Sequence, residues 1–143
     1  TFIKIIKIYL DILGFKNISP LNSDDNKLTD FKCISNTDSI LVSCAQNSLY
    51  GKEAKDEDDW ETTGRPEIQS FLARMYINDC KKGIFITNSY FSDLAIEFVD
   101  NFNNKNQDVE IKLINGYELT KSIRNHKYYI LKEELLNETK YNI

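Results

Sequence analysis

The chain has 143 residues, a length that suits a single domain. It carries 18 basic and 22 acidic side chains, a formal net charge of −4. This excess of acidic residues argues against a protein that binds nucleic acid through a uniformly basic surface. Its three cysteines form no CxxC pair and it has one histidine, which argues against a zinc site of ordinary ligand spacing and a secreted disulfide framework. No apolar run approaches the roughly 20 residues of a membrane span, so we expect a cytoplasmic protein with reduced cysteines.

Residues 2–13 predict an amphipathic helix that faces the core. Its apolar side chains recur at helical spacing, and the basic residues among them are too few for a membrane-surface role. Gly14 stands where a glycine in the left-handed conformation commonly ends a helix. The following segment, 17–27, is polar and rich in turn formers, so we expect a loop there.

Two short strands, 29–34 and 39–45, are predicted next, and the turn-forming residues between them indicate a hairpin. Successive side chains of a strand point to opposite faces. Asp30 and Lys32 therefore share one face of the first strand. The opposite, buried face should hold two reduced cysteines as small apolar fillers, Cys33 and Cys44.

A long polar connection, 46–64, separates this hairpin from the second half of the chain. It contains the acidic run 56–61, which we interpret as a solvated loop rather than a metal or partner site, because clustered like charges repel one another. A helix is predicted at 66–78 from apolar residues at i, i+3, i+4 and i+7 spacing, with Glu67 in its first turn.

The centre of the predicted fold is a short apolar strand, 83–87, followed by a helix at 92–101. Its β-branched and aromatic residues are typical of a strand buried on both faces, and Ser92 is a suitable N-cap for the helix. Another strand, 109–114, and a short helix, 117–124, complete the pattern. This alternation of strands and helices predicts an α/β domain with a mixed sheet flanked by helices.

We expect one domain at 1–124 and a C-terminal helical tail or linker at 125–143. A basic cluster near this boundary supplies candidate contacts to DNA phosphates, although a solvated end is the simpler interpretation. The candidate nucleic-acid-binding residues of this cluster are Lys121, Arg124 and Lys127.

Two segments, KGIFITNSYFSDLAIEFVD at 82–100 and EIKLINGYELTKSI at 110–123, resemble the Mrr-type restriction endonuclease family of the PD-(D/E)xK nuclease superfamily. In that family a KGVFITTSGFS segment precedes an aliphatic strand and a helix. The opening helix, which ends in a leucine-glycine-aromatic sequence, is similar as well. The resemblance runs from Phe2 to about Arg124 and implies a restriction-endonuclease-like fold, a central mixed sheet flanked by helices.

The resemblance also implies a catalytic motif, an aspartate on the first hairpin strand and a Gln/Glu-x-Lys on the second. Such residues hold Mg²⁺ and stabilise negative charge during phosphodiester hydrolysis. The aspartate falls on Asp30, whereas the other two positions fall on Ser43 and Ala45. We therefore expect a degenerate motif, no bound metal and no cleavage. The alternative is a relocated, Mg²⁺-dependent catalytic site made of Asp30, Lys32 and Glu67.

Three functions are compatible with this resemblance. The first is a catalytically degenerate scaffold that binds double-stranded DNA or a protein partner, as part of a larger defence-type polypeptide. The second is an active metal-dependent DNA endonuclease with the relocated site. The third is a dimerising structural domain, a homo-oligomer without a nucleic-acid role. Salt-dependent duplex binding separates the first from the third, and metal-dependent cleavage identifies the second.

Overall fold

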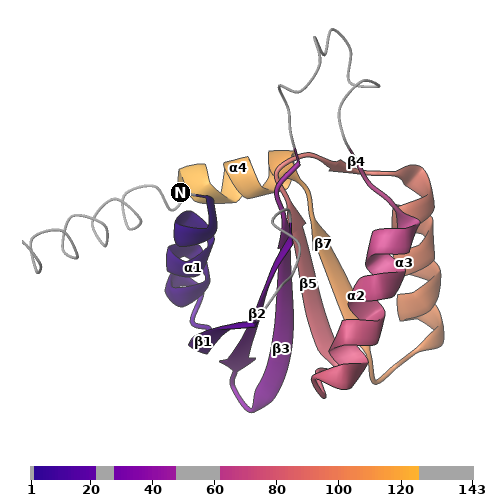
Figure 1. Ribbon diagram of the computed structural model, residues 1–143, viewed down its shortest axis with the longest axis horizontal. Coiled ribbons are helices and arrows are strands. Elements are labelled where there is room, and N and C mark those ends of the chain that lie inside the picture. The colour runs from indigo at the N-terminus through magenta and orange to yellow at the C-terminus, as the bar shows by residue number, and fades with distance from the viewer. Residues whose placement is uncertain (1, 22–27, 48–61, 126–143) are drawn as a thin grey trace, which may run out of the picture.

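The protein is described from a computed structural model that covers residues 2–21, 28–47 and 62–125 (Figure 1). Its helices are α1 (Phe2–Ile12), α2 (Arg65–Ile77), α3 (Asp93–Lys105) and α4 (Gly116–Asn125). Its strands are β1 (Lys16–Leu21), β2 (Leu28–Ser35), β3 (Asp38–Ala45), β4 (Thr62–Thr63), β5 (Lys82–Thr87), β6 (Tyr90–Phe91) and β7 (Glu110–Ile114).

Five strands form one mixed sheet in the order β1-β2-β3-β5-β7. The first three are antiparallel neighbours, and β3, β5 and β7 run parallel. The predicted mixed sheet is therefore confirmed. So is the inner position of β5, which pairs with a strand on each side.

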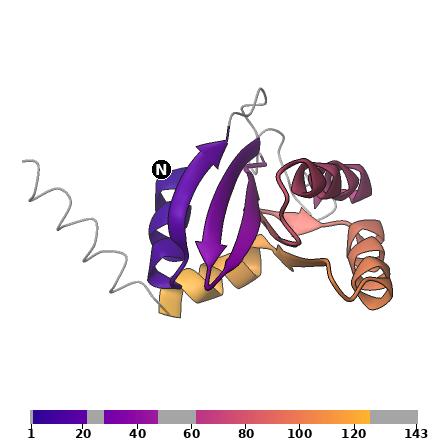
Figure 2. The same ribbon diagram turned by 90° about the horizontal axis from the view of Figure 1, so that it is seen from below.

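The helices cover the two faces of this sheet in pairs. α2 and α3 lie on one face, and α1 and α4 lie on the other (Figures 1 and 2). α2 joins β3 to β5 and α3 joins β5 to β7, so both are crossovers between parallel strands that step in the same direction. Right-handed crossovers of this kind place their helices on the same face of the sheet.

Each face has its own apolar core. On the α1–α4 face, the buried side chains of the core include Ile6, Leu10, Phe31, Cys33, Val42, Cys44, Ile86 and Leu119. On the α2–α3 face they include Leu41, Ile68, Phe71, Met75, Phe85, Ala95, Val99 and Ile111. Aromatic rings pack edge to face at the centre of the second core, with 5.2 Å between the ring centroids of Phe71 and Phe85.

Local features explain where the elements begin and end. Gly14 has a φ of +94° and lies two residues after the last residue of α1, as expected for a glycine that ends a helix. The Ser92 hydroxyl accepts a hydrogen bond of 3.2 Å from the backbone N–H of Ala95 and caps α3. At the start of α4, a Cβ on Gly116 would lie 2.4 Å from the carbonyl oxygen of Asn88, so only glycine fits this contact.

The predicted loop at 17–27 is wrong in its first part, because Lys16–Leu21 forms β1 and pairs with β2. Turn-forming residues made this segment resemble a loop, yet an available neighbouring strand outweighs weak local preference. Asn17 keeps its turn character within the strand, with a φ of +55° where the register shifts. Likewise, Thr62–Thr63 at the end of the predicted connection pairs with β6.

Several predictions concern segments outside the described residues: the acidic run 56–61, the tail at 126–143 and Lys127. The prediction for the buried cysteines is confirmed, since Cys33 and Cys44 are free thiols in the same core. Burial raises the pKa of Cys33 to about 11 and that of Cys44 to about 12. None of the described helices is long and apolar enough to cross a membrane.

Candidate functional site

Asp30, on which the sequence resemblance places the family aspartate, lies buried on the sheet beneath α2. Asp30 on β2 pairs directly with Ser43 on β3, so both side chains point to the α2–α3 face. Arg74 of α2 reaches down to this pair. Its Nε donates to Asp30 Oδ2 at 2.7 Å, and its Nη2 donates to Asp30 Oδ1 at 3.5 Å and to Ser43 Oγ at 3.2 Å.

The guanidinium of Arg74 is held from both sides. Its Nη1 donates to the hydroxyl of Ser70, one turn earlier on α2, at 2.9 Å, and its centre lies 5.7 Å from the ring centroid of Phe71. The Asp30 side chain is only 7% exposed and that of Arg74 is 24% exposed. A planar guanidinium matches a carboxylate at two points and stays charged, so Arg74 neutralises Asp30 within the fold.

The resemblance places the family lysine on an apolar residue, Ala45. Ala45 lies two residues after Ser43 on the same face of β3 and pairs with Leu28 on one side and Thr87 on the other. It is buried within the core beneath α2 and α3. A methyl group in this setting can neither stabilise negative charge nor orient a water molecule.

The alternative residues do not gather around Asp30. The Lys32 ammonium donates to the backbone carbonyl of Asn78, at the C-terminal end of α2, at 2.9 Å. Glu67 accepts a hydrogen bond of 3.0 Å from the backbone N–H of Gly64, at the N-terminal end of the same helix. Asn78 and Gly64 are 14 positions apart along the chain, which corresponds to roughly 21 Å at the rise of an α-helix. Each side chain satisfies a helix terminus.

Arg74 is the site residue that the sequence motif does not reveal, in contrast to Asp30, Ser43 and Ala45. A signal was present, since Arg74 stands at the border of the apolar stripe of its helix, three residues after Phe71. A cation at such a border, on a helix expected to cover a strand with an unpaired carboxylate, indicates an internal ion pair. The sequence does not say which strand lies under that border.

The residues at this site do not fit a divalent metal ion. Mg²⁺ binds through several oxygen ligands, usually with one or more free carboxylates. Here the single carboxylate is engaged by Arg74, and the neighbouring hydroxyl of Ser43 accepts a hydrogen bond from the same guanidinium. Across residues 2–21, 28–47 and 62–125, no three His, Cys, Asp or Glu side chains are grouped so as to hold a metal ion.

The carboxyl ends of β3 and β5 are closed by a second polar network. The backbone N–H of Asn47 donates to Asn88 Oδ1 at 2.8 Å, and Asn88 Nδ2 donates to the carbonyl of Asn47 at 3.0 Å. Asn47 Nδ2 also donates to the hydroxyl of Thr87 at 3.1 Å. These amides are paired with one another and so hold the carboxyl ends of β3 and β5 together.

The basic candidates lie on the other side of the molecule. Lys121 and Arg124 are exposed on α4, which covers the face of the sheet opposite to α2 (Figure 2). The structure therefore separates them from Asp30 by the sheet itself. On the same side, α1 exposes Lys4 and Lys7.

Known proteins share both the sequence pattern and the fold of this chain. A family model described as Restriction endonuclease, the Mrr catalytic domain, matches residues 1–123. Among solved structures, the crystal structure of the protein of unknown function AF1548 is similar, with a TM-score of 0.53 and 15% sequence identity. The match covers 78% of this chain and 55% of that chain, so this chain spans about half of that protein and the likeness shows the fold alone. No curated protein matches this chain.

Proposed function

Because this chain belongs to the Mrr-type restriction endonuclease family, we propose that it is a catalytically degenerate member, a double-stranded DNA-binding module of a larger defence-type protein. The observation that carries this proposal is the ion pair between Arg74 and Asp30, 2.7 Å long. Its internal cation lies against Asp30, the residue on which the resemblance places the family's metal-binding carboxylate. Asp30 then serves the fold instead of catalysis.

Competition between Arg74 and a metal ion favours the arginine. A metal ion would have to displace a guanidinium that makes hydrogen bonds to Asp30, Ser43 and Ser70. The displaced cation would stay partly buried without its partner, which is strongly unfavourable. The metal would gain one carboxylate and one hydroxyl, too few strong ligands to offset that loss.

The missing lysine argues in the same direction. Loss of a single group that stabilises transition-state charge commonly lowers the rate about 10²–10³-fold, and loss of the metal also removes the activated water. The resemblance places Ala45 and Ser43 at these two positions. Both losses act on one site, so their effects need not multiply.

Double-stranded DNA is the proposed partner of the α1–α4 face. Four exposed cations lie there, Lys4 and Lys7 on α1 and Lys121 and Arg124 on α4. Cations that contact phosphates give affinity that falls steeply with salt and is largely independent of sequence. Binding through this face leaves the Asp30–Arg74 pair unused, as expected of a scaffold.

A cleavage assay tests the catalytic part of the proposal. Plasmid and modified DNA are incubated with Mg²⁺ or Mn²⁺ and with wild-type protein or the Asp30→Asn variant, whose folding is checked by circular dichroism. We expect no metal-dependent cleavage by either. Cleavage by the wild type that is lost in Asp30→Asn would overturn the proposal and favour the relocated site with Lys32 and Glu67.

A gain-of-function variant sharpens this test. Ser43→Glu combined with Ala45→Lys restores the family motif, and adding Arg74→Gln frees Asp30 from its internal cation. Mn²⁺ binding measured by calorimetry should appear in the triple variant and stay weak when Arg74 is retained. Equal binding with and without Arg74 would show that the arginine does not compete with a metal.

Duplex binding is measured by fluorescence anisotropy over a series of salt concentrations. Replacing both Lys121 and Arg124 by alanine should lower the salt dependence, by about one unit of slope for each phosphate that is no longer neutralised. The matched control replaces Lys82 and Lys105, two exposed cations away from α1 and α4, and should leave the slope unchanged. A change of slope in the control variant alone would show that DNA binds to another face of the protein.

A further inference from the structure

The outer side of α4 combines an aromatic side chain with two cations. Tyr117, in the first turn of the helix, is 69% exposed. Lys121 and Arg124 follow four and seven positions later and are exposed as well. Residues at this spacing lie on one side of an α-helix, so the three side chains form one stripe, here called the α4 stripe. Its length from Tyr117 to Arg124 is roughly 10 Å at the rise of an α-helix.

The packing of α4 directs this stripe toward solvent. Leu119 is 4% exposed and lies in the core of the α1–α4 face, and partly buried Ile123 packs against the same core. Both stand roughly opposite to Tyr117 around the helix. The start of α4 is fixed to the sheet, because the backbone N–H of Gly116 donates to the carbonyl of Ser89 at 2.7 Å. Turning the stripe inward would expose Leu119, so its outward orientation is set by the fold.

The charge of the α4 stripe suits a phosphate backbone. Lys121 and Arg124 are separated by roughly 4.5 Å of helix rise, and both carry a positive charge. The acid of this helix, Glu118, lies about 100° around the helix from Tyr117 and therefore at the border of the stripe. Two neighbouring cations attract the phosphates of a nucleic-acid strand, and an exposed aromatic ring beside them offers a surface on which a base stacks.

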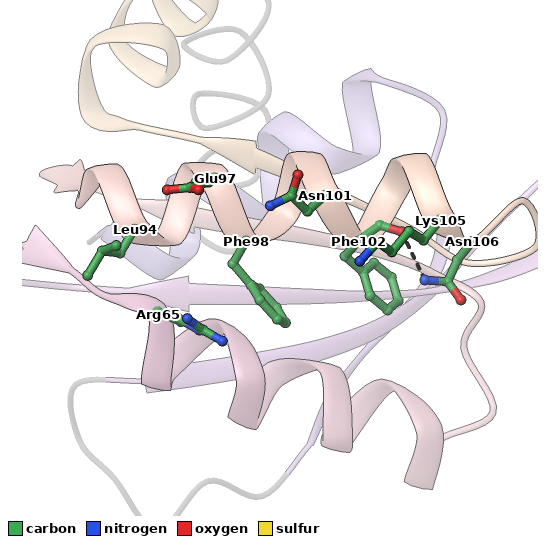
Figure 3. Close-up of a pocket in the computed structure, with 8 residues that line it drawn as sticks. All are labelled: Arg65, Leu94, Glu97, Phe98, Asn101, Phe102, Lys105 and Asn106. Carbon is green, nitrogen blue, oxygen red and sulfur yellow. Dashed lines mark hydrogen bonds between the residues drawn. The ribbon is translucent and has the colours of Figure 1, made fainter.

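The aromatic side chains between α2 and α3 do not offer such a surface. Phe98 and Phe102 project from α3 toward α2 (Figure 3) and stack with 6.3 Å between their ring centroids. The guanidinium of Arg65 lies 5.4 Å from the ring centroid of Phe98. These rings are therefore engaged by one another and by a side chain of the protein itself.

Tyr76 on α2 is the second strongly exposed tyrosine among the described residues, with 86% of its surface exposed. It differs from Tyr117 in its neighbours, because no lysine or arginine stands three or four positions from it on either side. Its nearest charged residue at such a spacing is Asp79, which repels phosphates. Tyr76 thus has the exposure of Tyr117 without the cations and serves as its matched control.

We propose that Tyr117 stacks on an unpaired base of the bound DNA while Lys121 and Arg124 contact the phosphates of the same strand. This inference rests on the proposed DNA binding by the α1–α4 face and specifies which DNA that face prefers. A base within an intact duplex is covered by its neighbours on both sides, so it offers no free surface to Tyr117. The preferred ligand is therefore a duplex with a single-stranded overhang. Every base has a stacking surface, so the preference is for structure rather than sequence.

Fluorescence anisotropy of the full 143-residue chain with two labelled probes tests this preference. The probes share one duplex, which is blunt in the first and carries an overhang of about six nucleotides in the second. The wild type should bind the overhang probe about 5- to 150-fold more tightly, the range that one stacked base contributes. Tyr117→Ala should lower this affinity to that for the blunt probe, and Tyr117→Trp should preserve it, because tryptophan also stacks. Tyr76→Ala should bind both probes like the wild type.

A 2-aminopurine base placed in the overhang reports the stacking directly. Its fluorescence should change when the wild type or Tyr117→Trp binds, and this change should be absent with Tyr117→Ala. Equal affinity of the wild type for the two probes would overturn the inference and leave the proposed duplex binding intact, as would a preference that survives in Tyr117→Ala. A Tyr117→Ala variant that weakens both probes equally would also overturn it, because Tyr117 would then contact the duplex. Absence of salt-dependent binding to either probe would instead overturn the proposed function.

Discussion

The two faces of the central sheet use alternate residues of the same strands, yet their chemistry differs. On the α1–α4 face, β2 and β3 present Phe31, Cys33, Val42 and Cys44 to an apolar core. On the α2–α3 face, the residues between them include Asp30 and Ser43, both buried and both bonded to Arg74. One face is held by non-directional apolar packing, and the other includes a directed ion pair.

If the site is degenerate, as we propose, this difference explains how its chemistry could be lost while the fold persists. Apolar packing constrains every side chain through volume, so the α1–α4 face tolerates little change. The polar positions on the other face need only a suitable partner. Arg74 supplies that partner for Asp30, so the carboxylate is satisfied within the fold without a metal ion.

The largest expected effect lies on the apolar face. Phe31→Ala should lower the free energy of unfolding by about 3–5 kcal/mol, since it removes a fully buried ring and leaves a cavity. Urea denaturation measures this change. Phe31→Leu is the control and should cost less than Phe31→Ala, because leucine leaves a smaller cavity. A small loss in Phe31→Ala would mean that this core is loosely packed.

Variants of the Asp30–Arg74 ion pair should change the free energy of unfolding in a non-additive way. Arg74→Ala should cost about 3 kcal/mol, the low end for breaking a buried pair, because Arg74 is partly exposed. The double variant Asp30→Leu/Arg74→Met should recover much of this loss, since no unpaired charge is left inside. A double-mutant cycle in urea measures the coupling. Additive losses would contradict the view that the two residues act as a unit.

Alkaline pH should lower the free energy of unfolding through the buried cysteines of the α1–α4 face. Burial raises the pKa of Cys44 from 9.0 to about 12, so between these values the unfolded chain loses a proton that the folded chain keeps. Ionisation then stabilises the unfolded state. The stability contributed by Cys44 is therefore fully present below pH 9 and is lost as pH rises toward 12.

The measurement compares wild type with Cys44→Ala in urea between about pH 7 and about pH 11, a range in which the ionisation of the thiol changes the stability. The advantage of the wild type should shrink as pH rises, because alanine does not titrate. Cys33, with its pKa raised to about 11, should behave in the same way over a narrower range. A constant difference across this range would mean that Cys44 ionises equally well in the folded protein.

The smallest effects concern the two residues of the alternative site. Lys32→Met removes a hydrogen bond to the C-terminal end of α2 and should cost about 1 kcal/mol. Glu67→Ala removes the bond to the backbone of Gly64 and should cost about 0.5–1 kcal/mol. DNA binding and the absence of cleavage should be unchanged in both. A catalytic phenotype in either variant would argue for the relocated site.

The sequence by itself determined the mixed α/β sheet, the central place of 83–87 and the buried cysteines, whereas the motif positions Asp30, Ser43 and Ala45 stay predictions from the resemblance. The first three follow from local periods, since helices and strands repeat their apolar residues at different spacings. A hairpin register follows from the same alternation, which is why Asp30 and Ser43 could be expected on one face.

Only the tertiary structure decided what Asp30 does. Its partner Arg74 is 44 residues away in the chain, and the contact depends on how α2 is rotated and where it crosses β2. Strand β1 was missed for a related reason, because its pairing with β2 outweighs the turn preference of its own residues. Contacts between distant segments depend on packing geometry, which local sequence patterns do not specify.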